Sequence, residues 1–241
     1  MAVYSLADLI IHVENRYDFL KNQCSQYEYG GSAPADFTIR VTDEDLCRER
    51  LASMGVSYSP GYLESVCAYR KIALNLPMYD AMLLHASVID CDGRGIGFLA
   101  RSGVGKTTHT LLWKQEFPEK VRIINGDKPI VRFFDGVPYA YGTPWAGKEG
   151  FQCKDRVQLT DICFIERGQE NSVRQLDPME YFNHLMVQTL HPSQEEAAEK
   201  TLTLLDMLMT RCRFWSIRCN TSPEAAHVAY HTILGEDNNE A

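Results

Sequence analysis

The sequence predicts an α/β fold in which a mixed β-sheet is flanked by helices. Three observations predict this class. An apolar run over residues 96–100 leads through a glycine-rich loop into a helical pattern over residues 106–116. A hairpin signal, Asp135-Gly136, follows the apolar run 130–134, and this dipeptide favours a two-residue β-turn. From residue 81 onward, strand and helix patterns alternate, as is typical of α/β proteins.

Residues 1–80 are expected to form a small α+β appendage. The run 37–41 alternates apolar and polar residues with period two, which predicts a strand. Thr42 precedes three acidic residues and is therefore a candidate N-cap of a short helix. Residues 62–76 have the apolar spacing of a helix, and a proline follows them.

Residues 81–241 are expected to form the main domain. The apolar run 82–89 is predicted as a strand that ends before the turn at Asp92-Gly93, and residues 121–124 and 162–165 are predicted as further strands. The last part of the chain contains three helical stretches, over residues 178–190, 194–210 and 223–233.

Charge and cysteine spacing exclude several classes. The chain has 241 residues, with 24 basic and 32 acidic side chains and a net charge of −8. Broad nucleic-acid binding needs a positive face, which this composition does not offer. The first residues do not predict an export signal, and no apolar run is long enough for a bilayer helix. The eight cysteines contain no closely spaced pair. We therefore expect reduced thiols and a cytoplasmic protein without a membrane partner.

The strongest chemical signal is the glycine-rich loop between the strand 96–100 and the helix 106–116. A strand that enters and a helix that leaves are the context of a phosphate-binding loop, whose backbone N–H groups point at anionic oxygens. Lys106 would reach the terminal phosphates and the Thr107 hydroxyl would ligate Mg²⁺. Ala100 stands where the first glycine of such a loop is usual. The alternative is a chance glycine-rich turn. The expected nucleotide-binding residues are Ser102, Gly103, Val104, Gly105, Lys106, Thr107 and Thr108.

Two further residues are candidates for catalysis. Asp127 follows the predicted strand 121–124, where a carboxylate beside the loop could hold Mg²⁺ or take the proton of an attacking hydroxyl. The alternative is a turn formed by Asn-Gly-Asp before a proline. His85 lies in an apolar run, 21 positions before Lys106. An isolated histidine there is usually a hydrogen-bonded core residue, and a functional role is the alternative.

Residues 142–150 form a loop with three glycines and a proline. One interpretation is a mobile lid over the phosphates, in which Trp145 is exposed, Lys148 adds a cation and Glu149 lies beside it. The other is an ordinary loop whose tryptophan caps the core. His227 and His231 lie four apart in a predicted helix, but no third metal ligand is evident, and a solvated helix face is favoured.

These motifs together resemble a known family. Leu84-His85-Ala86-Ser87, Gly95-Ile96-Gly97-Phe98, the segment 102–108 and Gly126-Asp127 are similar to blocks of the catalytic domain of HPr serine kinase. They are more similar still to small bacterial proteins described as HPr-kinase-like or phosphoenolpyruvate-carboxykinase-like, which also carry blocks like residues 141–145 and 147–149. The resemblance covers about residues 80–220. It implies a P-loop-containing mixed sheet, as in the C-terminal domains of those enzymes.

The resemblance also implies roles for the candidate residues. In HPr kinase a histidine stands at the same offset from the loop lysine, which places His85 near the acceptor. The family carries two adjacent aspartates after the next strand, one linked to metal and one to proton removal, whereas this chain has only Asp127. Asp127, His85 and Glu149 are therefore all candidates for the general base. Lys106 would act on the phosphates, and Thr107 with Asp127 would hold the metal.

The expected function is a Mg²⁺-dependent phosphotransferase. It would move a phosphoryl group from ATP or another nucleotide to the serine hydroxyl of a protein, a peptide or the free amino acid, and residues 1–80 would dock the acceptor. Three alternatives remain: a nucleotide-sensing module or degenerate kinase without one catalytic aspartate, carboxykinase chemistry, and a structural subunit. The resemblance also leaves room for a homo-oligomer, since the larger relatives form rings.

Overall fold

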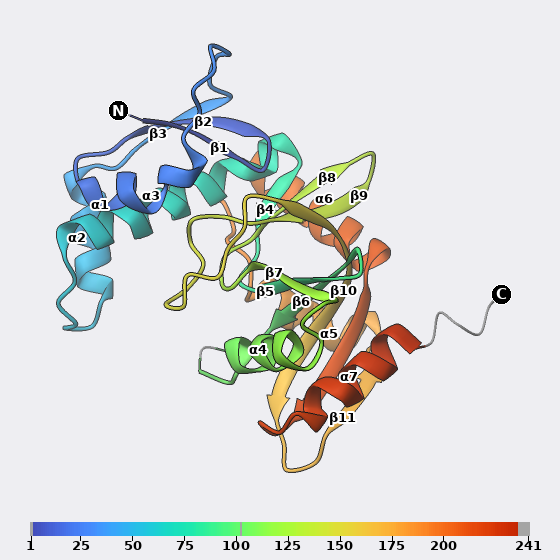
Figure 1. The fold of residues 1–241 in the computed structure, drawn as a ribbon. Coiled ribbons are helices and arrows are strands. Elements are labelled where there is room, and N and C mark those ends of the chain that lie inside the picture. Colours follow the sequence, from blue (N-terminus) through green and yellow to red (C-terminus); the bar gives the residue numbers. More distant parts are fainter. Residues whose placement is uncertain (1, 102, 236–241) are drawn as a thin grey trace.

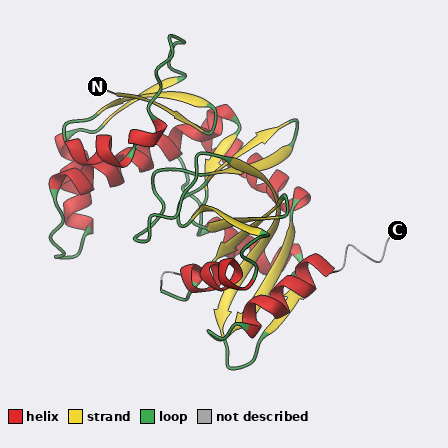
Figure 2. Ribbon diagram, in the orientation of Figure 1, coloured by secondary structure: helices red, strands yellow, loops and turns green. Residues whose placement is uncertain are grey.

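The computed structural model describes residues 2–101 and 103–235 and has a mixed α/β fold (Figure 1). Figure 2 shows a small sheet with its helices at one end and a larger, curled sheet with helices on both faces. The predicted α/β class is confirmed. Within the described ranges, no helix combines the length and the apolar character that crossing a bilayer requires.

The first part of the chain builds a three-stranded sheet on a helical layer. Strands β1 and β2 form an antiparallel hairpin, and β3 pairs with β2 in parallel. The predicted cap is confirmed, because Thr42 and Asp45 form a reciprocal capping box at the start of α2. The Glu64 carboxylate is fully buried in α3 and accepts hydrogen bonds from the amides of Arg16 and Tyr17 at 2.6 and 3.0 Å. The elements are β1 Ala2–Leu6, β2 Leu9–Glu14, α1 Asp18–Gln23, β3 Phe37–Arg40, α2 Asp43–Ala52 and α3 Pro60–Asn75.

The larger sheet has the strand order β4-β8-β9-β10-β6-β5-β7, with β12 beside β10 and β11 beside β12. Strand β10 is long enough to pair with β9 at its start and with β6 and β12, both in parallel, further along. The strands are β4 Ala81–Leu83, β5 Ser87–Cys91, β6 Arg94–Leu99, β7 Val121–Asn125, β8 Ile130–Phe134, β9 Val137–Tyr141, β10 Arg156–Arg167, β11 Ser172–Gln175 and β12 Arg213–Cys219.

Four helices cover the larger sheet. Apolar side chains of α4 and α7 pack on one face and those of α5 and α6 on the other. The helix predicted after the glycine-rich loop is confirmed, with the same bounds. The helix predicted over 178–190 ends at Met186. The helices are α4 Lys106–Glu116, α5 Pro178–Met186, α6 Glu195–Arg211 and α7 Glu224–Gly235.

The predicted strand over 82–89 is wrong, because the chain breaks at His85 into β4 and β5. β4 pairs with β8, whereas β5 pairs with β6 and β7. The two strands therefore belong to different parts of the curled sheet, and His85 lies at the change of direction.

A shared apolar core joins the small sheet to the larger one. Buried side chains of β1, β2 and α3 form one cluster with Leu83, Ile130, Tyr141 and Trp145. Polar contacts cross the same boundary, since the Tyr141 hydroxyl donates to Asp8 Oδ2 at 2.6 Å and Arg132 donates to the Ala7 carbonyl at 2.8 Å. The division into residues 1–80 and 81–241 stays a prediction.

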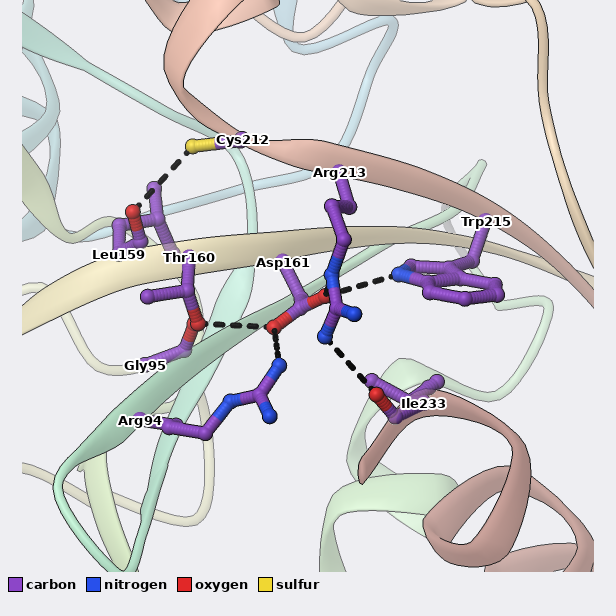
Figure 3. Close-up of polar contacts among 9 residues, drawn as sticks. All are labelled: Arg94, Gly95, Leu159, Thr160, Asp161, Cys212, Arg213, Trp215 and Ile233. Carbon is purple, nitrogen blue, oxygen red and sulfur yellow. Dashed lines mark hydrogen bonds and ion pairs between the residues drawn. The ribbon is translucent and has the colours of Figure 1, made fainter. Parts of the chain in front are cut away.

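A buried carboxylate fixes the centre of the larger sheet (Figure 3). Asp161 is 0% exposed in β10. Its Oδ1 accepts hydrogen bonds from Arg213 Nε and Trp215 Nε1, each at 2.9 Å, and its Oδ2 accepts from Thr160 at 2.8 Å and Arg94 at 3.1 Å. Arg213 also donates to the carbonyl of Ile233 near the end of α7 at 2.8 Å. The carboxylate thus connects three strands, and Arg213 extends the network to α7.

Candidate functional site

The glycine-rich loop before α4 has an unusual backbone. Gly103 and Gly105 have φ angles of +78° and +133°, which favour glycine, and a Cβ at either residue would meet open space. Among the described residues, the amides of Gly103, Gly105 and Thr107 have no hydrogen-bond acceptor, whereas the Val104 amide donates to Arg101 at 3.2 Å. Unpaired amides beside open space are the donors that an anion needs. Ser102, an expected phosphate ligand, lies outside the described residues.

Arg167, at the end of β10, binds two carbonyl groups of this loop. Arg167 donates to the carbonyl of Val104 at 3.1 Å through Nε and to that of Gly103 at 2.5 Å through Nη2. The guanidinium therefore keeps these two carbonyl oxygens turned toward the sheet. This contact joins residues 63 and 64 positions apart, and no local pattern in the sequence predicts it.

Lys106, the first residue of α4, extends into the site. The residue is 9% exposed, and its Nζ donates to the Ala100 carbonyl at 3.1 Å and lies 3.1 Å from His85 Nε2. Burial lowers the pKa of Lys106, and the negative charge of Asp127 opposes that shift. A partly desolvated ammonium interacts strongly with an added anion, because little water competes with it.

Asp127 and His85 meet beside this lysine. His85 Nε2 lies 3.1 Å from Asp127 Oδ1, and Lys128 Nζ lies 3.4 Å from Asp127 Oδ2. Burial alone would raise the pKa of Asp127, but the hydrogen bond from His85 and the charge of Lys128 outweigh it and hold the pKa below its ordinary value. Burial lowers the pKa of Lys128. Lys128 had no role among the expectations from the sequence, although it directly follows Asp127.

The turn that carries Asp127 is fixed by Asn125. Its Oδ1 accepts hydrogen bonds from the amides of Asp127 and Lys128 at 3.0 and 2.8 Å, and its Nδ2 donates to the Thr143 carbonyl at 2.9 Å. The structure thus contains the side-chain-bonded turn that the alternative interpretation of Asn-Gly-Asp described. The two interpretations are compatible, because this turn places the Asp127 carboxylate beside His85.

The turn has no room for a second carboxylate at position 126. A Cβ on Gly126 would lie 2.6 Å from the Ala146 carbonyl oxygen, closer than backbone and side chain can approach. The loop after β9 thus occupies the space that a side chain at position 126 would need. Lys128 fills the place on the other side of Asp127.

The loop after β9 is anchored by its tryptophan. The expectation that Trp145 is exposed is wrong: it is 6% exposed, and its Nε1 donates to Ser65 Oγ of α3 at 2.9 Å. Lys148 and Glu149 are exposed beyond it. Gly147 approaches the site closely, because a Cβ there would lie 3.4 Å from Asp127 Cβ. The exposed part of the loop nearest the site is residues 147–150.

Most of the residues described above line one cleft of about 1040 Å³ between the small sheet's helices and the glycine-rich loop. The expected phosphate ligand Val104 lines a neighbouring cavity instead. In Figure 1 the connection from α2 to α3, the loop after β9 and the loop before α4 lie on the same side of the molecule. The cleft brings together most of the expected site residues, namely His85, Gly103, Gly105, Lys106, Thr107, Thr108, Asp127, Trp145, Lys148 and Glu149. Five cations line it, Arg70, Arg101, Lys106, Lys128 and Lys148, against the carboxylates Glu49, Asp127 and Glu149.

Positive charge therefore exceeds negative charge in this cleft, although the chain has a net charge of −8. The excess suits a polyanion. Arg70 comes from α3 and pairs with Glu49 at 3.3 Å. No local pattern in the sequence could have assigned it to this site, because the packing of α3 across the cleft brings it there.

Oxygen donors for Mg²⁺ line the same cleft. Mg²⁺ that accompanies a nucleotide typically takes one or two protein ligands and completes its shell with phosphate oxygens and water. The Thr107 hydroxyl and the Asp127 carboxylate are ligands of this kind, and both line the cleft, so they fit the ion. Over the described ranges, no group of three or more His, Cys, Asp or Glu side chains is arranged to hold a metal. His227 instead lies 2.9 Å from Glu116 Oε2.

Comparisons with known proteins add a distant likeness in fold. No family model and no curated protein matches the sequence. Among solved structures, the chain is similar to the HPr(Ser) kinase/phosphatase from Coxiella burnetii, with a TM-score of 0.38 and 10% sequence identity, over 65% of this chain and 99% of that chain. The functional assignment therefore depends on the cleft.

Proposed function

We propose that the chain is a Mg²⁺-dependent phosphotransferase that moves the γ-phosphoryl group of ATP, or of another nucleoside triphosphate, to a serine hydroxyl. The observation that carries the proposal is the cleft itself. Loop amides without an acceptor among the described residues, the Lys106 ammonium and the Asp127 carboxylate line one cavity. Phosphoryl transfer requires chiefly alignment and charge neutralisation, and this set supplies both.

The loop would bind the phosphates. The amides of Gly103, Gly105 and Thr107 would donate to the phosphate oxygens, with the N-terminus of α4 behind them. Lys106 would turn from the Ala100 carbonyl, 3.1 Å away, toward the terminal phosphate. When bound, Mg²⁺ supplies further neutralisation of the phosphate oxygens, and Thr107 and Asp127 would hold it. Thr110 supports Lys106, since its hydroxyl donates to the Lys106 carbonyl at 2.9 Å.

The transfer step then involves Asp127 and His85. The acceptor hydroxyl oxygen forms a bond to the γ-phosphorus while the bond from that phosphorus to the β–γ bridging oxygen breaks, and the nucleoside diphosphate leaves with the electron pair. The hydroxyl proton passes to the Asp127 carboxylate. His85, 3.1 Å from that carboxylate, positions it. Glu149 is more exposed than Asp127, so we assign it no proton transfer.

A nucleotide sensor is the second candidate. It is favoured by one observation: both oxygens of Asp127 already face basic side chains, His85 at 3.1 Å and Lys128 at 3.4 Å. In this case the site would bind ATP without transferring its phosphate.

The cysteines support a cytoplasmic location for either function, since all eight are free thiols and six of them are buried.

A transfer assay separates the two candidates. The wild-type protein is incubated with radiolabelled ATP, Mg²⁺ and serine-containing peptides, and labelled peptide is measured. We expect Asp127→Asn to lower transfer about 100-fold or more, as is typical for loss of an acid–base group. The matched control is Asp135→Asn, in the exposed turn between β8 and β9. Tight ATP binding without transfer to any acceptor would favour the sensor.

A further inference from the structure

The wall of the cleft opposite the glycine-rich loop is apolar and exposed. Four side chains of α3 and the segment before it form it, and we call them the apolar wall: Met54, Val56, Tyr58 and Tyr62 are 94%, 54%, 44% and 41% exposed. Tyr58 and Tyr62 stack with ring centroids 4.9 Å apart, and Phe19 contacts Tyr62 edge-on at 6.0 Å. Soluble proteins rarely expose contiguous apolar surface without a binding role.

The backbone holds this wall outward. Met54 has a φ angle of +47°, a conformation that non-glycine residues rarely adopt, and Gly55 follows at +84°. On this turn the Met54 side chain is exposed to solvent. Of the six described non-glycine residues with a positive φ, Met54 is the one that lines the cleft.

The apolar wall borders the reactive groups. Its four residues line the same cleft as Lys106 and Asp127. Burial raises the pKa of the Tyr62 phenol, and the charge of Asp127 contributes to the same shift. Tyr62 is therefore within electrostatic reach of the carboxylate that would take the acceptor proton. The apolar wall and Asp127 thus face one cavity, which an acceptor would share with both.

The nucleotide leaves the apolar wall free. Its phosphates would occupy the cationic side of the cleft, and a second cavity of about 350 Å³ borders the loop from the side of β10 and β12. That cavity is lined by Val104, Thr108 and Asn220, among others, and offers space for the nucleoside. Free serine has no apolar group to cover the wall.

We propose that the acceptor is a peptide segment with an apolar or aromatic residue next to its serine, and that the apolar wall binds this residue. The inference rests on the proposed phosphotransferase function and selects one of its three acceptor classes. Covering each exposed apolar side chain removes area from water, a favourable change. In an extended peptide, the serine could reach Asp127 while its neighbouring residue contacts the apolar wall.

The test uses synthetic peptides with a single serine, flanked either by leucine and phenylalanine or by asparagine and glycine, and free L-serine. Transfer is measured with radiolabelled ATP and Mg²⁺. Binding is measured by fluorescence anisotropy with labelled peptides whose serine is replaced by alanine, so that binding is recorded without transfer. We expect kcat/KM and affinity to be about tenfold or more higher for the apolar peptide, because one well-buried side chain contributes this much.

The double variant Tyr58→Ala, Tyr62→Ala should abolish this preference and leave ATP affinity unchanged. Tyr29→Ala, a tyrosine outside the residues that line the cleft, is the control and should retain the preference. Three results would overturn the inference. The first is equal transfer to free serine and to the apolar peptide, and the second is a preference that survives in the double variant. The third is loss of ATP affinity in that variant, which would mean that the two tyrosines bind the nucleobase of ATP.

The failures can be told apart. If the phosphotransferase proposal fails, no acceptor is labelled, and the peptide inference falls with it. If only the inference fails, labelling persists but does not depend on the apolar flank or on the two tyrosines. ATP titration of both variants shows in each case whether the fold and the nucleotide site are intact.

Discussion

His85 Nε2 lies 3.1 Å from Lys106 Nζ and also 3.1 Å from Asp127 Oδ1. One imidazole nitrogen either accepts a hydrogen bond or donates one. When Nε2 carries no proton it accepts from Lys106, and when it carries one it donates to Asp127. His85 thus joins the residue proposed to bind phosphate to the residue proposed to take the acceptor proton. Release of Lys106 to a nucleotide would leave Nε2 free to donate to Asp127.

His85→Gln should lower kcat about tenfold to 100-fold with little change in KM for ATP. The reason is that a glutamine amide in place of the imidazole would not hold Asp127 in the same orientation, and acid–base positioning contributes at about this level. Steady-state kinetics measure both parameters. His231→Gln, an exposed histidine of α7, serves as the control. A rise in KM for ATP with unchanged kcat would mean that His85 acts through phosphate binding instead.

Gly126→Ala should destabilise the protein by about 1–3 kcal/mol, because its Cβ would meet the Ala146 carbonyl oxygen at 2.6 Å and overpacking costs this much. Chemical denaturation measures the change. Gly30→Ala is the matched control, since a Cβ there meets nothing within 4 Å. Equal stabilities of the two variants would contradict the account of why position 126 carries no side chain.

Asp161→Asn should lower the free energy of unfolding by about 3–5 kcal/mol, the range for breaking a buried ion pair. Figure 3 shows why: the Asp161 carboxylate is the common partner of Arg94, Arg213 and Trp215. Thermal and denaturant unfolding measure the loss, again with Asp135→Asn as control. A loss below about 1 kcal/mol, the level of an exposed pair, would show that the network contributes little.

Stability should fall as the pH drops from about 6.5 to about 4 through His109. Burial lowers the pKa of His109 from 6.5 to about 4, and its Nε2 accepts a hydrogen bond from Trp113 at 3.0 Å. The unfolded chain therefore takes up a proton in this window while the native protein does not, and the stabilisation present above pH 6.5 is lost as the pH falls. The loss is about 3 kcal/mol at one pKa unit per 1.4 kcal/mol.

The variant His109→Gln isolates this contribution, because the amide oxygen of glutamine can accept from Trp113 without titrating. The difference in unfolding free energy between wild type and variant should shrink across the window, and His231→Gln should keep the wild-type slope. Parallel pH profiles for the wild type and His109→Gln would exclude His109 as the cause.

Local patterns predicted the parts of the fold that local interactions determine. The helix from Lys106, the Thr42 cap and the hairpin at Asp135-Gly136 all depend on residues within a few positions of one another. The hairpin of β1 and β2 was not predicted from the sequence, because its turn is Ala7-Asp8, which contains no glycine although the φ angles are +50° and +58°.

Contacts between residues far apart in the sequence could not be predicted from local patterns. Strand β12 carries Arg213, whose charge is matched by Asp161, 52 positions away. Trp145 donates a hydrogen bond to Ser65 of α3, 80 positions away. In the site, the motif residues Lys106 and Asp127 were predicted together because a phosphate-binding loop and the next strand end share one edge of a sheet. Arg70 and the apolar wall reach the cleft only through the packing of α3.

The most direct test of the phosphate site is calorimetric titration of ATP with Mg²⁺ into the wild type, Lys106→Met and the control Lys154→Met, an exposed lysine outside the residues that line the cleft. We expect binding by the wild type and Lys154→Met. For Lys106→Met we expect affinity about tenfold to 100-fold weaker, because a charge-assisted hydrogen bond contributes about 1.5–3 kcal/mol. Absence of ATP binding by the folded wild type, or equal affinity of all three proteins, would contradict the proposed site.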